Sequence, residues 1–292
     1  MKTKIVLLGA NGQLGSDILS VFADLKSFEL IPVLRRDLDV SDTGRIGAFL
    51  DGIGDIGYLI NCTSYHKTDE CEDYPELAFR INAIAPREMA KWCSRRGSAL
   101  IHFSTDYVFS GNATTPYKEE DAVGPLNVYG NSKASGEFFI RTHHDRHYII
   151  RVSSLFGKKG ASGKGGNFAE TMIRLARQGV PLKVVHDQRM SPTHTLDIAK
   201  AVRALIEQSA PHGTYHCCSS GECSWYEFAA EIFARLRLRA DLTPVASDKY
   251  GAKAKRPAYS VLDNAKIGVF HPMPHWRKAI SEYLRLKGHL AE

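Results

Sequence analysis

A glycine-rich turn close to the start of the chain limits the possible folds most strongly. Residues 5–8 read IVLL, and residues 9–15, which follow at once, read GANGQLG. An amphipathic helical pattern then covers residues 14–25. Glycines between a strand and a helix permit a tight turn and let a pyrophosphate approach the backbone, where the helix presents its amide hydrogens. In this context the segment predicts a dinucleotide-binding turn, with an ordinary strand–helix connection as the alternative.

Short apolar runs alternate with amphipathic stretches through the first half of the chain. Strands are predicted over residues 5–8, 29–34, 58–62, 99–104 and 148–152, and helices over residues 14–25 and 76–95. This alternation is typical of βαβ units in a parallel sheet. We therefore predict an α/β fold with a Rossmann-type doubly wound parallel sheet, which binds ligands at the carboxyl ends of its strands.

The pattern changes after residue 156. Residues 157–166 read GKKGASGKGG and predict a loop, either a flap over a substrate or a plain excursion. Helices are predicted over residues 167–178, 196–208, 224–236 and 276–286, and a strand over residues 182–185. We predict an NAD(P)-binding Rossmann domain at residues 1–155 and a smaller mixed α/β substrate-binding lobe at residues 156–292, with segments of the lobe returning to the Rossmann sheet.

Composition limits the class of partner. The 292 residues carry a formal net charge of +6, and Lys and Arg are scattered rather than clustered. This favours an anionic small molecule over nucleic acid. The sequence contains no apolar run near the roughly 20 residues of a membrane helix, and the apolar start is too short for a signal peptide. We therefore expect a cytoplasmic protein with no membrane partner, whose six cysteines are free thiols.

The second predicted strand runs into VLRRD at residues 33–37, which bears on the choice of cofactor. Enzymes that bind NAD usually place a carboxylate here, whereas a guanidinium can pair with the extra phosphate of NADP. Arg35 and Arg36 therefore favour NADPH, with NADH as the alternative. Asp39, followed by Val40, can accept a hydrogen bond from the adenine amine. All of these residues could also be ordinary loop residues.

Three pieces of sequence point to carbonyl chemistry. The fourth predicted strand is followed by Thr105, and residues 129–133 read YGNSK. Tyr129 and Lys133 share a helix face because they are four residues apart. A nearby ammonium lowers the pKa of a phenol from about 10, which suits a general acid for a carbonyl oxygen that receives hydride. The Thr105 hydroxyl can orient the same oxygen, and Lys133 can also hold the nicotinamide ribose.

The chain resembles the extended short-chain dehydrogenase/reductases, and among them the dTDP-4-dehydrorhamnose reductase family. The resemblance covers nearly the whole chain. It rests on STDYVF at 104–109, PLNVYGNSK at 125–133, NFA at 167–169, DQ at 187–188, PT at 192–193 and RPAYSVLD at 256–263. It implies that NADPH reduces the C4 keto group of a nucleotide-linked 4-keto-6-deoxy sugar, converting dTDP-4-dehydro-L-rhamnose to dTDP-L-rhamnose.

The same resemblance implies a set of site residues. The catalytic residues would be Thr105, Tyr129 and Lys133. The cofactor would be bound by Gly9, Asn11, Gly12, Gln13, Leu14, Arg35, Arg36, Asp39, Val40, Cys62, Thr63, Ser64, Tyr65, Asn82, Tyr129 and Lys133. The sugar nucleotide would contact Tyr107, Val108, Asn167, Gln188 and Arg256. A guanidinium also suits a diphosphate on physical grounds, although Arg256 could equally be a surface arginine before a proline turn.

We predict no metal ion. Family members with magnesium use one acidic residue just after the glycine turn and another shortly after the Pro-Thr pair. Asp17 matches the first position, but Leu196 occupies the second. His143, His144 and His147 lack acidic or cysteine partners at ligand spacing, so we expect them to be solvated. The sequence leaves open whether a second copy of this chain is a partner in a homodimer.

Two alternatives to this function remain. One is the same chemistry on another nucleotide sugar, since neither the base nor the product stereochemistry follows from the sequence. The other is a non-catalytic NADP-binding subunit that regulates S-adenosylmethionine synthetase, against which the intact trio argues. Dehydratases with this fold often carry an acidic pair after the threonine, whereas Asp106 and Tyr107 follow Thr105 here.

Overall fold

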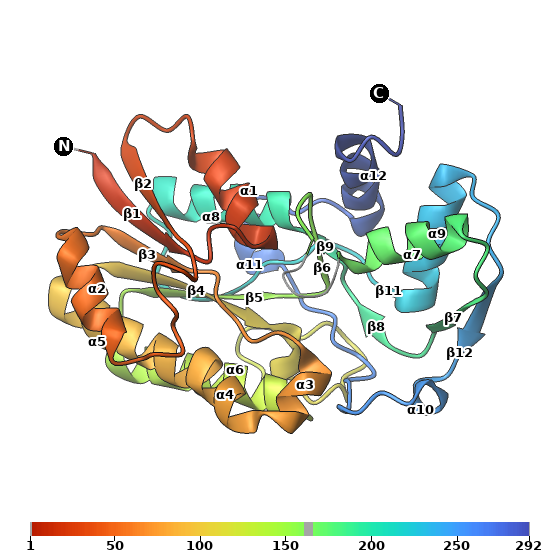
Figure 1. Ribbon diagram of the computed structural model, residues 1–292, viewed down its shortest axis with the longest axis horizontal. Coiled ribbons are helices and arrows are strands. Elements are labelled where there is room, and N and C mark those ends of the chain that lie inside the picture. The colour runs from red at the N-terminus through yellow and green to blue at the C-terminus, as the bar shows by residue number, and fades with distance from the viewer. Residues whose placement is uncertain (1, 161–165, 292) are drawn as a thin grey trace.

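A six-stranded parallel sheet forms the centre of the protein and confirms the predicted fold class (Figure 1). The computed structural model describes residues 2–160 and 166–291. The strand order is β10-β5-β4-β3-β1-β2, and every neighbouring pair is parallel. The strands are β1 (Thr3–Leu8), β2 (Phe28–Val33), β3 (Tyr58–Asn61), β4 (Ala99–Thr105), β5 (His147–Val152) and β10 (Gly213–His216). The first five lie close to their predicted bounds.

Helices cover both faces of this sheet (Figure 1). One face carries α2 (Arg45–Ile53), α3 (Thr68–Asp73), α4 (Pro75–Phe79), α5 (Ala85–Arg96) and α6 (Val128–His143); the other carries α1 (Gln13–Phe22), α8 (Thr195–Glu207) and α11 (Ala265–Gly268). Side chains alternate along a strand, so Ile5 and Leu7 join the apolar cluster with α1 and α8, whereas Val6 and Leu8 join the cluster with α2 and α5. This two-sided burial explains why β1 reads as a continuous apolar run.

The predicted helix at 76–95 is interrupted by a π-helical turn, Arg80–Ile84. Pro86 has no backbone N–H, so the carbonyl of Asn82 lacks its regular helical donor four residues later. A Cβ on Gly136 of α6 would lie only 2.2 Å from that carbonyl oxygen. Glycine therefore lets α6 pack closely against the turn that carries Asn82.

The second half of the chain builds a smaller lobe beside the sheet (Figure 1). Its strand pairs are β6 (Leu155–Phe156) with β9 (Thr193–His194), β7 (Leu182–Val185) with β12 (Leu242–Val245), and β8 (Arg189–Met190) with β11 (Cys223–Ser224). Its helices are α7 (Phe168–Arg177), α9 (Trp225–Leu236), α10 (Ser247–Tyr250) and α12 (Trp276–Leu286). Phe156, Phe228, Trp276 and Tyr283 belong to a separate apolar cluster there.

The second half also contributes to the central sheet. Strand β10 pairs with β5, and α8 packs against α1. The division into domains at residues 155 and 156 stays a prediction. Of the predicted 157–166 loop, residues 161–165 lie outside the described residues, so the flap is also still a prediction.

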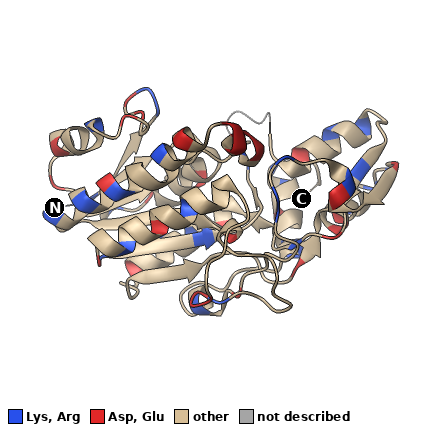
Figure 2. Cartoon of the chain, turned by 90° about the horizontal axis from the view of Figure 1, so that it is seen from below, with Lys and Arg blue, Asp and Glu red and all other residues tan. Residues whose placement is uncertain are grey.

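The charged residues, the helices and the cysteines each bear on a prediction made from composition. Basic and acidic residues are interspersed along the helices (Figure 2). Within the described ranges, no helix is both long and apolar enough to span a membrane. All six cysteines are free, as predicted.

Candidate active site

The glycine turn lies where β1 and β3 end, at the point where the strand order reverses. Gly9 has φ +75°, and a Cβ on it would lie 3.2 Å from the carbonyl carbon of Cys62. A Cβ on Gly15 would lie 2.3 Å from the oxygen of Gly9. Among the described residues, no side chain caps α1 at Gly12, and Oε1 of the buried Gln13 has no partner. Uncapped amides and an unpartnered polar atom beside a narrow turn fit a bound pyrophosphate.

The loop after β2 presents two exposed arginines. Arg35 donates from Nε to Oδ2 of Asp39 at 3.0 Å, and Arg36 lies 3.7 Å from Asp37. Burial raises the pKa of Asp39, but hydrogen bonds from Ser41 and Arg35 outweigh it and hold that pKa below its ordinary value. Arg35 is therefore an exposed cation tethered by Asp39, which suits the phosphate contact predicted for it. Val40 is buried, and Asn11 is exposed beside the glycine turn.

Asn82 fixes the segment that follows β3. Its Oδ1 accepts from the Tyr65 amide at 2.9 Å and from the Ser64 hydroxyl at 3.2 Å. Its Nδ2 donates to the Tyr65 carbonyl at 3.1 Å and to Oγ of Ser132 at 3.0 Å. Because Ser132 lies on α6, this buried amide joins the predicted cofactor-lining stretch at 62–65 to the helix that carries Tyr129.

Tyr129 and Thr105 come together at the carboxyl end of β4. Asn127 caps α6 by accepting from the Gly130 amide at 2.7 Å, which places Tyr129 in the first turn. Burial is the largest influence on the Tyr129 phenol and raises its pKa above the ordinary value, although hydrogen bonds with Thr105 and Ser64 act to lower it. The ring meets that of Tyr107 edge to face, with centroids 6.1 Å apart.

Lys133 corrects one prediction. Its Nζ donates to the Phe103 carbonyl at 2.5 Å and lies 3.0 Å from Nε2 of His102, so its long stem runs to β4 rather than toward the phenol. Burial lowers the pKa of Lys133 to about 7, while the charge of Glu137 acts to raise it. The expected lowering of the Tyr129 pKa by Lys133 is therefore wrong for this arrangement, because burial of the phenol dominates.

A buried carboxylate missing from the predicted site holds Thr105 in place. The Thr105 hydroxyl donates to Oδ1 of Asp106 at 3.0 Å and accepts from the Tyr107 amide at 3.2 Å. Oδ2 of Asp106 accepts from Ser153 at 2.8 Å and from Ser260 at 2.6 Å. Burial raises the pKa of Asp106, and these hydroxyls act against that rise. The only sequence signal was an acidic residue inside the STDYVF block.

Arg256 links the two halves of the chain beside Tyr107. Its guanidinium binds both carboxylate oxygens of Asp69 on α3, at 3.2 and 2.8 Å. It also lies within hydrogen-bonding reach of the Tyr107 side chain. Gln188 is buried next to Arg189, which forms a bridge with Tyr259 in the segment that carries Arg256. The structure thus places three of the five predicted sugar-nucleotide residues on three adjoining segments, of which the one with Tyr107 contacts Tyr129.

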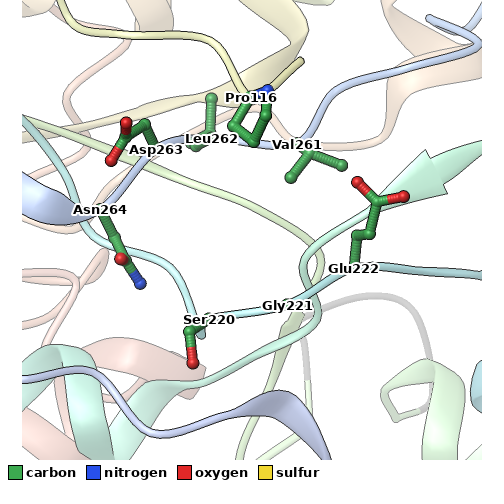
Figure 3. Close-up of a pocket in the computed structure, with 8 residues that line it drawn as sticks. All are labelled: Pro116, Ser220, Gly221, Glu222, Val261, Leu262, Asp263 and Asn264. Carbon is green, nitrogen blue, oxygen red and sulfur yellow. The ribbon is translucent and has the colours of Figure 1, made fainter. Parts of the chain in front are cut away.

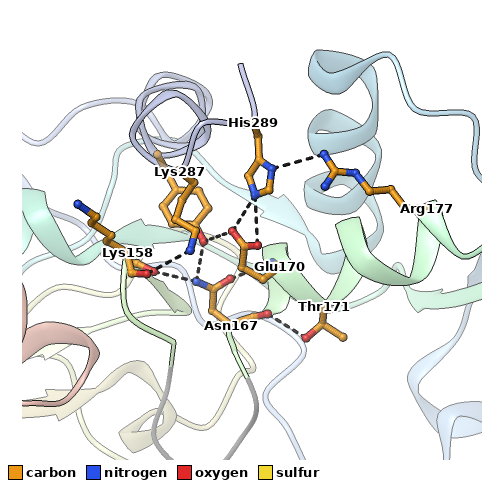
Figure 4. A network of polar contacts seen from close by, with 9 residues as sticks. Lys158, Asn167, Glu170, Thr171, Arg177, Lys287 and His289 are labelled. Atoms are coloured by element: carbon orange, nitrogen blue, oxygen red, sulfur yellow. Dashed lines mark hydrogen bonds and ion pairs between the residues drawn. The ribbon is translucent and has the colours of Figure 1, made fainter. Parts of the chain in front are cut away.

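The other two predicted residues, Val108 and Asn167, are packed or hydrogen-bonded within the protein, and their contact with the sugar nucleotide stays a prediction. Val108 is fully buried in a cluster with Phe109 and Tyr117, so its side chain has no surface for a ligand. Asn167 caps α7 by accepting from the Glu170 amide, and its Nδ2 donates to the Gly157 carbonyl and to the Tyr283 hydroxyl, both at 3.1 Å (Figure 4). Its polar atoms are engaged within the protein, as those of Arg256 are with Asp69, and its contact with the sugar nucleotide stays a prediction.

Two observations bear on the metal prediction. Asp17 is buried, and its Oδ2 accepts from the Thr195 hydroxyl at 2.5 Å. Across residues 2–160 and 166–291, no group of three or more His, Cys, Asp or Glu could hold a metal ion. The absence of a metal stays a prediction. His144 and His147 are buried against backbone carbonyls, so the expectation that they are solvated is wrong.

A cavity of about 260 Å³ opens in another part of the protein (Figure 3). It is lined by Pro116, Ser220, Gly221, Glu222, Val261, Leu262, Asp263 and Asn264. Among these described lining residues none is basic, and Glu222 already pairs with Arg189 and accepts from Tyr259. The charged groups that a diphosphate would meet there are the carboxylates of Glu222 and Asp263, so we do not place the sugar nucleotide in this cavity.

A doubly wound parallel sheet with a glycine turn at its switch point, and a phenol beside a threonine at the same edge, defines a Rossmann-type oxidoreductase of the short-chain class. Within that class, the model of the RmlD substrate binding domain family matches residues 3–287, and the chain belongs to this family. This confirms the family resemblance.

The comparisons with individual proteins agree. The spore coat polysaccharide biosynthesis protein SpsK of Bacillus subtilis is 39% identical, with 97% of each chain covered. The structure of a dTDP-4-dehydrorhamnose reductase from Clostridium acetobutylicum is 37% identical and has a TM-score of 0.91, covering 97% of this chain and 99% of its own. The Bacillus anthracis dTDP-4-dehydrorhamnose reductase in complex with NADP is 34% identical with a TM-score of 0.90, covering 98% and 100%.

Proposed function

We propose that the protein is an NADPH-dependent reductase that converts dTDP-4-dehydro-L-rhamnose to dTDP-L-rhamnose by reducing the C4 keto group. The observation that carries this proposal is the meeting of the Tyr129 phenol and the Thr105 hydroxyl at the sheet edge that also bears the glycine turn. The relatives named dTDP-4-dehydrorhamnose reductase, one of them solved with NADP, support the substrate and the cofactor.

NADPH, when bound, supplies the hydride for C4. The amides at the start of α1 would hold its pyrophosphate, and Arg35 and Arg36 its additional phosphate. The segment that follows β3 would line the cofactor because Asn82 holds it against α6. These residues would bind and orient the cofactor. The proton for the carbonyl oxygen comes from a different residue.

Tyr129 donates the proton to the carbonyl oxygen. Its raised pKa keeps the phenol protonated near neutral pH, which is the state that a reduction requires of its acid. Thr105, held by Asp106 and the Tyr107 amide, positions the phenol. Its hydroxyl proton would turn from Asp106 to the carbonyl oxygen when the substrate binds. Burial of this pair excludes water from the oxygen that gains charge.

Arg256, Tyr107 and Gln188 would bind the sugar nucleotide. A guanidinium that already makes a two-point contact with the Asp69 carboxylate has the geometry for a diphosphate, which would replace or share that partner. A cytoplasmic location and a homodimer remain predictions that accompany this proposal.

The decisive assay supplies NADPH and one of two enzymatically prepared substrates, dTDP-4-dehydro-L-rhamnose or dTDP-4-dehydro-6-deoxy-D-glucose. We expect loss of NADPH absorbance with the first substrate and dTDP-L-rhamnose as the product by NMR. Reduction of the D-sugar alone would replace the proposed substrate, and loss of NADPH with neither substrate would refute this reductase function.

The Arg35→Ala variant tests the cofactor preference. Loss of one charge-assisted contact to a phosphate should weaken NADPH binding roughly tenfold, while NADH, which lacks that phosphate, should bind nearly as before. Titration of the variant with each nucleotide measures both affinities. Arg96→Ala, which removes another exposed arginine, paired with Asp51, is the matched control. Equal weakening of both nucleotides in Arg35→Ala would reject the preference for NADPH.

A further inference from the structure

A chain of buried polar side chains runs beneath the active site. Nδ2 of Asn61, at the end of β3, lies 3.1 Å from Nδ1 of His102 on β4. Nε2 of the same ring lies 3.0 Å from Nζ of Lys133 on α6. Each of these three residues is only 1% exposed, so their polar atoms are paired within the protein rather than with bulk water. The direction of each hydrogen bond therefore depends only on which atoms of these residues and their protein neighbours can donate and which can accept.

The amide of Asn61 has only one allowed orientation. One of its terminal atoms receives the backbone N–H of Thr63 at 3.0 Å and the Thr63 hydroxyl at 2.6 Å. A backbone N–H can only donate, so the atom that faces it is the oxygen. The nitrogen of Asn61, which can only donate, therefore faces His102.

The tautomer of His102 follows from that orientation. Because Nδ1 faces a donor, it must accept, and the single proton of the neutral ring lies on Nε2. If the ring carried two protons, its Nδ1–H would point at the N–H of Asn61. Burial also lowers the pKa of His102 well below its ordinary value, which keeps the ring neutral.

The N–H at Nε2 points at Lys133, and this settles the state of the lysine. An ammonium carries three donors and no acceptor, whereas a neutral amine has one lone pair. We propose that Lys133 is a neutral amine in the cofactor-free protein, accepting a hydrogen bond from His102, and that His102 is a positioning residue that holds it in this state. The hydrogens of the amine remain available for the Phe103 carbonyl at 2.5 Å.

The charges around Lys133 are compatible with this state. Glu137, one turn later on α6, favours the ammonium, but its carboxylate already pairs with Arg151 of β5 and with Arg141. The other titratable groups that face α6 lie near its first turn or on its outer surface. They are Asp106 and Tyr107 before α6, Cys71 and Glu72 of α3, and Arg87 of α5. Burial therefore remains the dominant influence and favours the uncharged amine.

The consequence for catalysis rests on the proposed function. When a proton from water adds to the Nζ lone pair, the nitrogen can no longer accept, and its contact with the N–H of His102 must break. The ammonium keeps the Phe103 carbonyl as acceptor and can turn toward Tyr129, one turn earlier on the same helix face. The charge that stabilises a phenolate would thus be acquired near neutral pH rather than held permanently.

Nuclear magnetic resonance of the cofactor-free protein tests the protonation states directly. Imidazole ¹⁵N shifts distinguish the two tautomers, and lysine side-chain ¹³Cε and ¹⁵Nζ shifts report charge; His102→Gln and Lys133→Met assign the signals. We expect His102 to carry its proton on Nε2, and Lys133 to titrate near pH 7. A proton on Nδ1, or a Lys133 that titrates near the ordinary value of about 10.4, would overturn the proposal.

The His102→Gln variant tests the role of the ring. Its side-chain carbonyl can accept from an ammonium, so the midpoint of Lys133 should rise by about one pH unit or more. The control is His144→Gln, which removes another buried imidazole that contacts the Ser98 carbonyl at the opposite end of β4. An equal rise in both variants would reduce His102 to a purely structural role. These signals need neither cofactor nor sugar, so a failed reductase assay would leave them unchanged.

Discussion

The Tyr129→Phe variant is expected to lose about 10²- to 10⁴-fold in kcat/KM for the keto sugar, while NADPH binds with nearly its normal affinity. Phenylalanine keeps the buried ring and its edge-to-face contact with Tyr107. It lacks the hydroxyl that meets Thr105 and Ser64, and with it the proton for the carbonyl oxygen. Steady-state rates, a titration with NADPH and a thermal unfolding curve separate loss of chemistry from loss of binding or folding.

Tyr215→Phe is the matched control for this change. Tyr215 is another buried tyrosine, on β10, and its hydroxyl donates to the Pro211 carbonyl far from the site. Its loss should leave kcat/KM near that of the wild type. Full activity in Tyr129→Phe, or an equal loss in both variants, would remove Tyr129 from its role as the acid.

The central sheet was predictable because its signals are local. The apolar run of β1, the glycines after it and the periodicity of α1 lie within one short segment, and each depends on backbone geometry or one-sided burial. β10 was not predictable in the same way. It reads GTYH and becomes a strand only because it pairs with β5, more than sixty residues earlier in the chain. Its tendency to form a strand is therefore tertiary rather than local.

The residues of the candidate site also divide into those with a local sequence signal and those whose position depends on partners far along the chain. Thr105 and Tyr129 follow from a strand end and a helix spacing, and the structure does bring them together. The direction of Lys133 depends on His102 and the Phe103 carbonyl, and the support for Thr105 comes from serines 47 and 154 residues away from Asp106. Buried polar groups choose partners by three-dimensional proximity, which spacing along the chain does not reveal.

Arg151 lies on β5, and its replacement by methionine is expected to have the largest effect on stability. The guanidinium is 1% exposed and binds Glu137 at two points, 3.0 and 2.8 Å. It also donates to the Glu119 carbonyl at 3.2 Å. Removing Arg151 leaves the buried Glu137 carboxylate with only the more exposed Arg141 as a cation. Loss of one partner of a buried pair costs about 3–5 kcal/mol in free energy of unfolding. Chemical denaturation at neutral pH measures this loss.

The pH dependence of the loss identifies its cause. Burial raises the pKa of Glu137, but Arg151 and Arg141 outweigh it and hold the pKa below its ordinary value. In the wild type this pairing stabilises the fold above the unfolded pKa of about 4.3 and is lost as pH falls through the folded value. In Arg151→Met the more exposed Arg141 is the main remaining group that opposes burial, so the pKa of Glu137 rises. The penalty should therefore be largest at neutral pH and shrink as acid protonates Glu137.

Two further variants complete the experiment. Arg141→Met removes the more exposed partner of the same carboxylate, which should cost less than about 1 kcal/mol. The double variant Glu137→Gln with Arg151→Met removes the stranded charge and should recover part of the stability lost in Arg151→Met alone. Equal losses in the two arginine variants, or a penalty for Arg151→Met that does not change with pH, would show that the guanidinium acts by filling space rather than by compensating a buried carboxylate.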